Sequence, residues 1–256
     1  MIQIDQDKCN DCGICGHLCP RHIPETVEQG NEKKTIISEK RIDLCMECGQ
    51  CEAVCPNQAI HVTKLKGEDF DPVPTLDISD EQLLSLMKHR RSVRRYKDKP
   101  VSRDILERML EAAHLAPTGT GRRSTGAIII DEPKILNALS DRFYKLYMDL
   151  EKALKNPIAR FIIKRRVGGA TLGTLQNFVM PGMHWYIRWY HSGQSNEILR
   201  DCPALILFYS PVLEPMASEN CLIAAFHTIL MAEVLGVGTC FNDLIPPACN
   251  NLLKGK

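Results

Sequence analysis

The N-terminal part of this 256-residue chain contains cysteines whose spacing could bind metal. The pattern C-x2-C-x2-C-x3-C-P occurs twice, ending once at Pro20 and once at Pro56. The chain has 12 cysteines. In a compartment that keeps thiols reduced, this number indicates metal ligation rather than disulfides. The eight cysteines of the two copies are Cys9, Cys12, Cys15, Cys19, Cys45, Cys48, Cys51 and Cys55.

The spacing within each copy predicts cubane 4Fe-4S clusters. A three-residue step allows successive thiolates of one tight loop to reach different irons of a single cube, while the fourth cysteine points away. The fourth cysteine of each copy is therefore expected to ligate the cluster of the other copy. The predicted ligand sets are Cys9, Cys12, Cys15 and Cys55 for one cluster, and Cys45, Cys48, Cys51 and Cys19 for the other.

The alternative to clusters is a pair of zinc sites, because C-x2-C pairs also build zinc ribbons. Zinc needs four ligands per site and has no use for the proline that follows each last cysteine. Gly13, Gly16 and Gly49 favour clusters, because backbone N–H groups must approach the inorganic sulfides closely. Residues 1 to about 65 resemble the bacterial two-cluster ferredoxins.

The elements around the cysteines predict a small first domain at residues 1–66. Short apolar strands are expected at 2–4, 35–38 and 60–63, and so small a fold would depend on its clusters for stability. Residues 67–78 contain two prolines and four acidic residues, which is typical of an extended linker. The remaining residues, 79–256, are predicted to form the second domain.

Charge and hydropathy limit the possible environments of the chain. The first 66 residues hold 8 Lys and Arg against 10 Asp and Glu, a net charge of −2, so the overall +1 leaves +3 for the remainder. Apolar residues make up 44% of the chain, which predicts a folded globular protein. The N-terminus has no signal-peptide pattern, and the apolar runs are too short to span a bilayer. We therefore expect a cytoplasmic protein with no membrane partner.

The second region predicts an α+β domain with three αβα layers, because helical and strand patterns alternate along it. Helices are expected after the Ser79–Gln82 capping box and over residues 103–114. A third helix, over residues 220–235, is apolar nearly all round and is predicted to be buried, with a subunit interface as one location for it. Strands are expected at 127–130, 204–209 and 239–242.

A basic stretch at residues 88–97 has three interpretations: a nucleic-acid patch, a solvated helix end or a phosphate site. Arg90, Ser92 and Arg94 alternate directly after a predicted helix, where an extended backbone would place them on one side. Two guanidiniums and a hydroxyl on one side suit a phosphate monoester, which arginine binds through paired N–H donors. This arrangement favours the phosphate site, and no nucleic-acid partner is expected.

The motifs RRSVRRY, LEAAHLAPTG, DCPALILF and ENCLIAAFHTILMAEVLGVGTC follow one another between about Ser79 and Pro247. In this order they resemble the nitroreductase superfamily, whose members are FMN-binding homodimers. The pairing with a ferredoxin segment is similar to a group of fusion proteins of anaerobes. The resemblance implies that FMN is held by Arg90, Arg91, Ser92 and Arg94, by Gly238 and Thr239, and by Pro117, Thr118 and Gly119 of the other subunit.

Two features depart from the superfamily pattern. Gly121, Arg122 and Arg123 stand where relatives carry Asn and then Gln, so flavin affinity or substrate choice is expected to differ. The chain also stops at Lys256, soon after Pro247, where relatives continue through a helix and a strand that crosses to the partner subunit. This stop suggests a truncated or naturally shortened form.

Other residues receive structural interpretations. Of the remaining cysteines, 202, 221, 240 and 249, only Cys240 is expected to lie near the flavin, by the resemblance. Residues 152–166 predict a solvated helix in a mobile lid, with a membrane-surface helix as the alternative. The aromatic residues Trp185, Tyr186, Trp189 and Tyr190 are expected in the core, with a segment that covers a planar substrate as the alternative.

The combination predicts an oxidoreductase with two 4Fe-4S clusters and FMN. Electrons from an external low-potential donor, a reduced carrier protein or NAD(P)H, would reach FMN and leave as hydride to a small planar acceptor such as a nitroaromatic, quinone or activated alkene. The flavin does the chemistry, so no catalytic side chain is expected. The alternative is an electron-transfer module that relays electrons between a protein donor and a protein acceptor.

Overall fold

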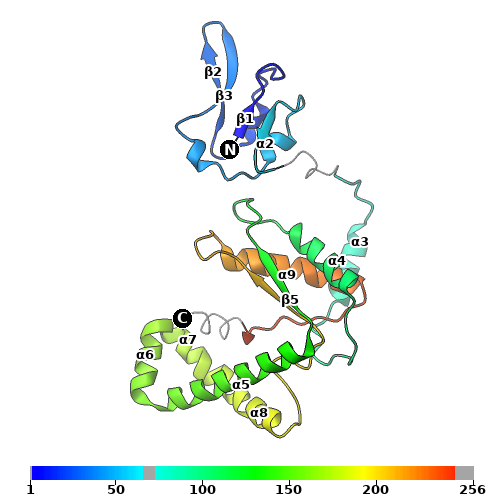
Figure 1. The fold of residues 1–256 in the computed structure, drawn as a ribbon, viewed down its shortest axis with the longest axis vertical. Coiled ribbons are helices and arrows are strands. Elements are labelled where there is room, and N and C mark those ends of the chain that lie inside the picture. Colours follow the sequence, from blue (N-terminus) through cyan, green and yellow to red (C-terminus); the bar gives the residue numbers. More distant parts are fainter. Residues whose placement is uncertain (1, 66–72, 246–256) are drawn as a thin grey trace. The chain divides into compact units, whose positions relative to one another are not determined.

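A computed structural model describes residues 2–65 and 73–245 of the chain (Figure 1). Backbone contacts divide the chain into two compact units, each described here by itself. The first unit holds the residues up to Asp80 together with the segments Ala116–Thr125 and Ser210–Cys221, and the second unit holds the rest. The predicted linker lies partly outside the described residues, and the predicted domain limits stay a prediction.

The first unit contains two small antiparallel sheets. Strand β1 (Ile2–Ile4) pairs with β4 (Ile60–Val62), so that Ile2 lies opposite Val62. Strands β2 (Pro24–Gln29) and β3 (Glu32–Ile37) form a hairpin, whose turn has Gly30 in the left-handed region at a φ of 66°. The three predicted strands are confirmed, although β3 begins earlier than expected and β2 was not predicted.

Short helices follow the cysteine loops at equivalent positions of the two copies. Helix α1 (Ile14–Leu18) begins after Gly13 and α2 (Gln50–Ala53) begins after Gly49, with φ angles of 72° and 77° at the two glycines. The short helix η1 (Ile42–Leu44) leads into the second copy. The core of this unit is small and consists of buried Ile2, Ile23, Ile60 and Val62, against which five of the motif cysteines pack.

The second unit is built around strands β5 (Gly126–Ile130) and β6 (Leu205–Tyr209), which pair antiparallel. Helices α4 (Arg103–His114) and α9 (Ala217–Val234) pack against these strands (Figure 1). The contact consists of buried Leu106, Met109 and Ala232 with Ile129 and Ile206 of the strands. Helix α3 (Asp80–His89) precedes α4, so the helices predicted after Ser79 and over 103–114 are confirmed.

The strand predicted at residues 239–242 is wrong. Only Thr239 forms a bridge, parallel to Ser92, and the following residues are not paired as a strand. The reason is local: the side chain of Asn242 accepts a hydrogen bond from Leu244 N at 3.1 Å, which turns the backbone. The mixture of helices and strands agrees with the predicted α+β class.

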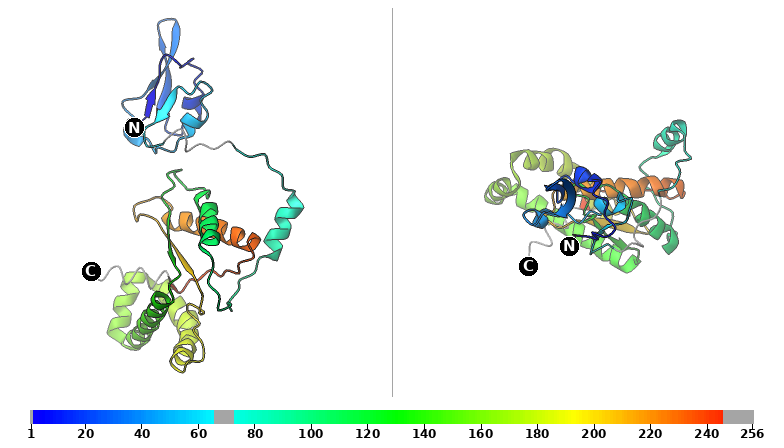
Figure 2. Two further views of the ribbon diagram at one scale, coloured as in Figure 1. Left: turned by 45° about the vertical axis from the view of Figure 1, so that its right-hand side comes forward. Right: turned by 90° about the horizontal axis from the view of Figure 1, so that it is seen from above.

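Between β5 and β6 the chain forms a helical extension (Figure 2). It consists of α5 (Pro133–Lys155), α6 (Pro157–Val167), α7 (Gly169–Thr174), a π-helical turn, η3 (Leu175–Val179), and α8 (Met180–His191). Asn156 separates α5 from α6 and caps α6, because its Oδ1 accepts hydrogen bonds from Ile158 N at 2.9 Å and Ala159 N at 3.2 Å. The core between α5 and α8 contains Phe143, Tyr144, Tyr147, Met183 and Ile187.

The aromatic residues of α8 divide between core and surface. Tyr186 and Tyr190 pack against the core, and Tyr190 stacks on Tyr144 with 3.9 Å between ring centroids. Trp185 is 50% exposed, so the prediction of core packing is wrong for this residue. Helical spacing alone did not distinguish the face that Met183 and Ile187 occupy from the neighbouring face.

Helix α9 is buried on one face only within the single chain. Ala224, Ile229 and Ala232 are buried, whereas Leu222 is 58% exposed and Phe226 is 41% exposed. Burial of the whole helix is therefore not achieved by the chain itself. In the described part of the chain, no helix is long and apolar enough to cross a membrane.

Candidate functional site

The first predicted ligand set surrounds one pocket in the first unit. Cys9, Cys12, Cys15 and Cys55 all line it, together with glycine, proline and apolar residues of the loops. Cys55 comes from the second copy of the motif, as the crossed arrangement requires. All four thiols are free, and Ala59 N lies 3.2 Å from Cys55 Sγ, so a backbone N–H already points at one sulfur.

The second predicted ligand set also gathers in one place. Burial, together with the nearby Cys48, Cys45 and Cys19, raises the pKa of the Cys51 thiol to about 12. Burial likewise raises the pKa of Cys15, and there the neighbouring thiols are Cys12, Cys55 and Cys9. In both places the neighbours are the other members of the same crossed set. Thiolates buried among one another need a positive group to compensate them.

Backbone geometry repeats around the two sets. Each copy has a left-handed residue two positions after its first cysteine, Asp11 with φ 57° and Glu47 with φ 52°. Each copy has another left-handed residue three positions after its last cysteine, His22 with φ 49° and Gln58 with φ 50°. With Gly13 and Gly49, these bends turn successive N–H groups into concavities of the kind that bind iron–sulfur clusters.

The donor chemistry therefore fits clusters better than single ions. Among the described residues, no group of three or more His, Cys, Asp or Glu side chains is close enough to hold one metal ion. Thiolates that bind different irons of a cube lie farther apart than the ligands of one zinc ion.

In the second unit, the basic stretch after α3 meets the segment after α9. Ser92 and Thr239 form the parallel bridge, and Val93 N donates a hydrogen bond to Thr239 O at 2.9 Å. The approach requires a glycine, because a Cβ on Gly238 would lie 2.8 Å from the Val93 side chain. Two motifs that are distant in sequence, and that both belong to the predicted flavin set, therefore lie side by side.

Thr239 supports the placement of a ligand here. Its Oγ1 is buried and has no hydrogen-bond partner among the described residues. A buried hydroxyl without a partner is costly, and a polar ligand atom would satisfy it. The predicted residues Ser92, Gly238 and Thr239 thus lie together, beside one buried hydroxyl that has no protein partner among the described residues.

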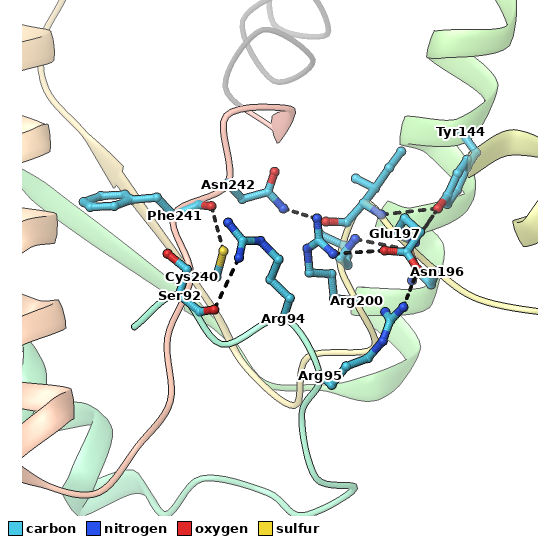
Figure 3. Close-up of polar contacts among 12 residues, drawn as sticks. Ser92, Arg94, Arg95, Tyr144, Asn196, Glu197, Arg200, Cys240, Phe241 and Asn242 are labelled. Atoms are coloured by element: carbon cyan, nitrogen blue, oxygen red, sulfur yellow. Dashed lines mark hydrogen bonds and ion pairs between the residues drawn. The ribbon is translucent and has the colours of Figure 1, made fainter. Parts of the chain in front are cut away.

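The three arginines of the predicted set behave differently. Arg91 donates hydrogen bonds to the carbonyl oxygens of Lys88 and Arg90, so its guanidinium lies at the C-terminal end of α3. Arg94 is exposed, and its one hydrogen bond within residues 2–65 and 73–245 is long, 3.5 Å from its Nη1 to Ser92 O (Figure 3). Arg90 is half-buried. Arg94 is therefore free to bind an anion, whereas Arg91 is engaged with the backbone.

The predicted residues Pro117, Thr118 and Gly119 belong to the first unit. Asn220 fixes this turn, because its side chain is fully buried and its Oδ1 accepts a hydrogen bond from Gly119 N at 3.0 Å. Thr118 Oγ1 is buried and, like Thr239 Oγ1, has no partner within the described range. The sequence did not single out Asn220, although an asparagine at the start of an apolar helix was a visible signal.

The residues that depart from the superfamily pattern form a tight turn after Thr120. Gly121 has a φ of 71° and Arg123 a φ of 49°, so two residues of this turn are left-handed. Thr120 Oγ1 donates a hydrogen bond to Glu214 Oε1 at 2.6 Å. The role of these residues toward the flavin stays a prediction.

Cys240 lies directly beside the Ser92–Thr239 bridge. Its Sγ is 3.2 Å from Phe241 O. Burial, together with the nearby Cys240 and Cys202, raises the pKa of Tyr96 to about 12. Both cysteines thus lie near Tyr96, while Cys249 lies outside the described residues.

A buried carboxylate, which was not predicted from the sequence, also lies next to the basic stretch. Glu197 forms ion pairs with Arg95 and Arg200, each at 2.9 Å (Figure 3). Burial raises the pKa of Glu197, but hydrogen bonds from Arg95 and Ser195 and the charges of Arg95 and Arg200 outweigh it, so the pKa lies below its usual value. Glu197 is therefore charged at neutral pH.

Comparison with known proteins agrees with this geometry. Residues 87–248 match the nitroreductase family, and residues 8–60 match the 4Fe-4S dicluster domain. No curated protein matches the chain. Because the first match covers more than half of its length, the chain belongs to the nitroreductase family, and it carries an N-terminal 4Fe-4S dicluster domain.

Several solved structures are similar at low identity. An FMN-bound nitroreductase from Bacteroides fragilis is 19% identical over 67% of this chain and 75% of its own, with a TM-score of 0.49. An FMN-bound nitroreductase from Desulfitobacterium hafniense is 19% identical over 67% and 74%, with a TM-score of 0.47. A BluB-like flavoprotein from Clostridium difficile is 15% identical over 68% and 81%, also with a TM-score of 0.47.

The family match confirms the α+β fold class, the predicted family pairing and the enzyme class. The chain is a nitroreductase-family oxidoreductase with a 4Fe-4S dicluster domain.

Proposed function

We propose that this protein passes electrons from its two 4Fe-4S clusters to FMN and on, as hydride, to a planar acceptor such as a nitroaromatic, a quinone or an activated alkene. Each cluster handles one electron, whereas a flavin accepts electrons singly or in pairs, so their combination converts one-electron supply into two-electron chemistry. Under this proposal the side chains bind and orient the cofactors, and none acts as nucleophile or base.

The observation that carries the proposal is the bridge between Ser92 and Thr239, which joins two distant motifs of the family in one polar site. Arg90 and Arg94 are assigned to the FMN phosphate and Ser92 to the ribityl chain. Arg94 is the better supported of the two arginines, because its guanidinium is exposed and only weakly engaged. Arg91 is assigned to the end of α3, since its donors already bind backbone oxygens.

Gly238 and Thr239 are assigned to the flavin ring. The close contact of Gly238 with Val93 leaves backbone where a side chain would otherwise stand, and Thr239 Oγ1 supplies an unpaired polar atom. Pro117, Thr118 and Gly119 are assigned to the flavin of a partner subunit. The buried, unpaired Thr118 Oγ1 and the hydrogen bond from Gly119 to Asn220 support an ordered turn at that place.

The cluster ligands are proposed to cross between the two copies of the motif. The pocket lined by Cys9, Cys12, Cys15 and Cys55 supports one set. The proximity of Cys19 to the half-buried Cys51 supports the other. Each cluster would then bind both copies, so that loss of either fourth cysteine would damage mainly the cluster of the other loop.

A homodimer is proposed as the working form. The apolar face of α9 that includes Leu222 and Phe226 is exposed in the single chain, and a second copy would cover it. The electron donor is proposed to be a reduced carrier protein or NAD(P)H, and the protein is proposed to work in the cytoplasm.

The proposal is tested by anaerobic purification, followed by measurement of iron, sulfide and FMN and by a screen of acceptors. We expect about eight irons and eight sulfides per chain, one FMN site per chain, and steady-state turnover with small planar acceptors. Two zincs without sulfide would contradict the cluster assignment. Full cofactor content without turnover of any small acceptor would instead favour the relay between protein partners.

A further inference from the structure

The buried side chain of Glu197 forms two ion pairs, one through each carboxylate oxygen. Oε1 accepts from Arg95 Nη2 at 2.9 Å, and Oε2 accepts from Arg200 Nη1 at 2.9 Å (Figure 3). The Glu197 side chain is only 8% exposed, whereas the Arg95 side chain is 73% exposed. The carboxylate is thus a fixed point in the protein, and the arginine is the partner that is held by it.

The backbone around Glu197 is held from several sides. Tyr144 Oη, in a residue that is 1% exposed, accepts hydrogen bonds from Glu197 N at 2.8 Å and from Ile198 N at 3.3 Å. Asn196 Nδ2 donates to Ser140 Oγ at 2.9 Å. Arg200 is left-handed with a φ of 60°, a conformation that a non-glycine residue keeps only when its surroundings enforce it.

This loop is tied to both segments of the candidate flavin site. Arg95 directly follows Arg94, and Asn242 Nδ2 donates a hydrogen bond to Ile198 O at 2.6 Å (Figure 3). Asn242 stands three residues after Thr239. The loop at Glu197 therefore holds two segments. One contains Arg95, next to the proposed phosphate-binding Arg94, and the other contains Asn242, near Thr239.

From this geometry we infer that Glu197 is a positioning residue for the phosphate grip, which is the arginine site at Arg94 proposed to bind the flavin phosphate. This inference rests on the proposed FMN site. The side chains of Arg94 and Arg95 leave the chain in different directions (Figure 3). Glu197 holds Arg95 on the protein side, and this leaves Arg94 to face the ligand. It also offsets one of the two positive charges of Arg95 and Arg200 and engages donors of both guanidiniums, which leaves Arg94 as the arginine that meets the anion of the ligand.

The inference is tested with Glu197→Gln in the full-length protein, by measuring the affinity for FMN and for riboflavin, which lacks the phosphate. A residue that positions the phosphate grip should matter only when the phosphate is present. We expect the Kd for FMN to rise about tenfold, equivalent to about 1.4 kcal/mol, while the Kd for riboflavin changes by less than about twofold.

Two further variants keep the test decisive. Arg95→Gln removes the exposed partner of Glu197, which is less disruptive to folding, and should lower the preference for FMN over riboflavin to the same extent. Glu107→Gln is the matched control, because Glu107 pairs with Arg103 at the same 2.9 Å but its side chain is 60% exposed. We expect this control to leave both affinities unchanged.

Equal loss of FMN and riboflavin affinity in Glu197→Gln would show a merely structural role and overturn the inference. Unchanged FMN affinity in both Glu197→Gln and Arg95→Gln would overturn it as well. If the unmodified protein binds riboflavin as tightly as FMN, there is no phosphate grip, and the proposed assignment of Arg94 fails together with this inference.

Discussion

The two regions of the molecule build their sites in different ways. In the first unit, eight cysteines lie in two short copies of one pattern, and the left-handed residues Asp11 and Glu47 recur at the same offset. In the second unit, Ser92 and Thr239 come together only through the fold, and a loop from a third place, at Glu197, holds them. Chemistry that depends on local spacing is visible in a sequence, whereas chemistry that depends on distant contacts is only partly visible.

The largest expected effect breaks the crossed arrangement of the first unit. Cys19→Ala should remove the cluster whose other ligands are Cys45, Cys48 and Cys51, because a cube with three thiolates is readily lost. Iron and sulfide should fall to about half of the value in the unmodified protein. Cys202→Ala, at a half-buried cysteine outside the motifs, is the control and should leave both contents unchanged. Loss of only the cluster at Cys9, Cys12 and Cys15 would reverse the assignment.

The next prediction tests which arginine, Arg94 or Arg91, binds the FMN phosphate. Arg94→Ala should raise the Kd for FMN about ten- to a hundredfold, since loss of one charge-assisted contact costs about 1.5–3 kcal/mol. Arg91→Ala should raise it less than about threefold, because the Arg91 guanidinium already binds the carbonyls of Lys88 and Arg90. Flavin fluorescence titration measures both. Equal effects of the two substitutions would mean that Arg91 leaves α3 to bind the ligand.

A smaller effect tests the close approach of the two distant segments. Gly238→Ala places a Cβ 2.8 Å from the Val93 side chain, so the bridge between Ser92 and Thr239 should be strained. We expect the Kd for FMN to rise about tenfold, or about 1.4 kcal/mol, and Val93→Ala in the same chain should restore part of the loss. Gly182→Ala, which meets no atom within 4 Å, is the control. Full affinity in Gly238→Ala would show that the approach is not needed.

The smallest effect tests the repeated backbone bends of the first unit. Gln58→Gly should stabilise the protein by up to about 1 kcal/mol, because a left-handed residue with a Cβ costs about 1–2 kcal/mol and glycine entropy offsets part of the gain. Gln29→Gly, in strand β2, should instead destabilise it by about 0.5–1 kcal/mol. Urea unfolding under anaerobic conditions measures both changes. The same sign for both glutamines would contradict the strained bend at Gln58.

The difference between local and distant contacts also explains which elements could be predicted from the sequence. The strands at 2–4 and 60–63 and the helix at 103–114 were predicted because apolar spacing and caps are local signals. The strand at 239–242 was wrong, since its pairing depends on Ser92 and ends at Asn242. Trp185 was misplaced because spacing does not say which face of a helix meets the core.

The candidate sites show the same limit. The cysteines and the basic motif were recognisable from residue type and order. Glu197 and Asn220 were not, because an acidic residue and an amide have no special spacing, and their importance arises from burial and from partners far along the chain. The sequence signal for each of them was weak: a charged or amide residue beside a strongly apolar segment.

Electron transfer from the clusters to the flavin is the central claim, and cutting the linker tests it most directly. A protease site introduced near Asp71 would separate the two predicted domains without altering any proposed ligand. Flavin reduction by an external one-electron donor is then followed by anaerobic stopped-flow absorbance in intact and cleaved protein. We predict that cleavage slows flavin reduction and makes its rate depend on protein concentration, because the linker supplies the effective concentration of the cluster domain. Flavin reduction at the same rate after cleavage, at every protein concentration, would contradict the account and place the clusters outside the electron path.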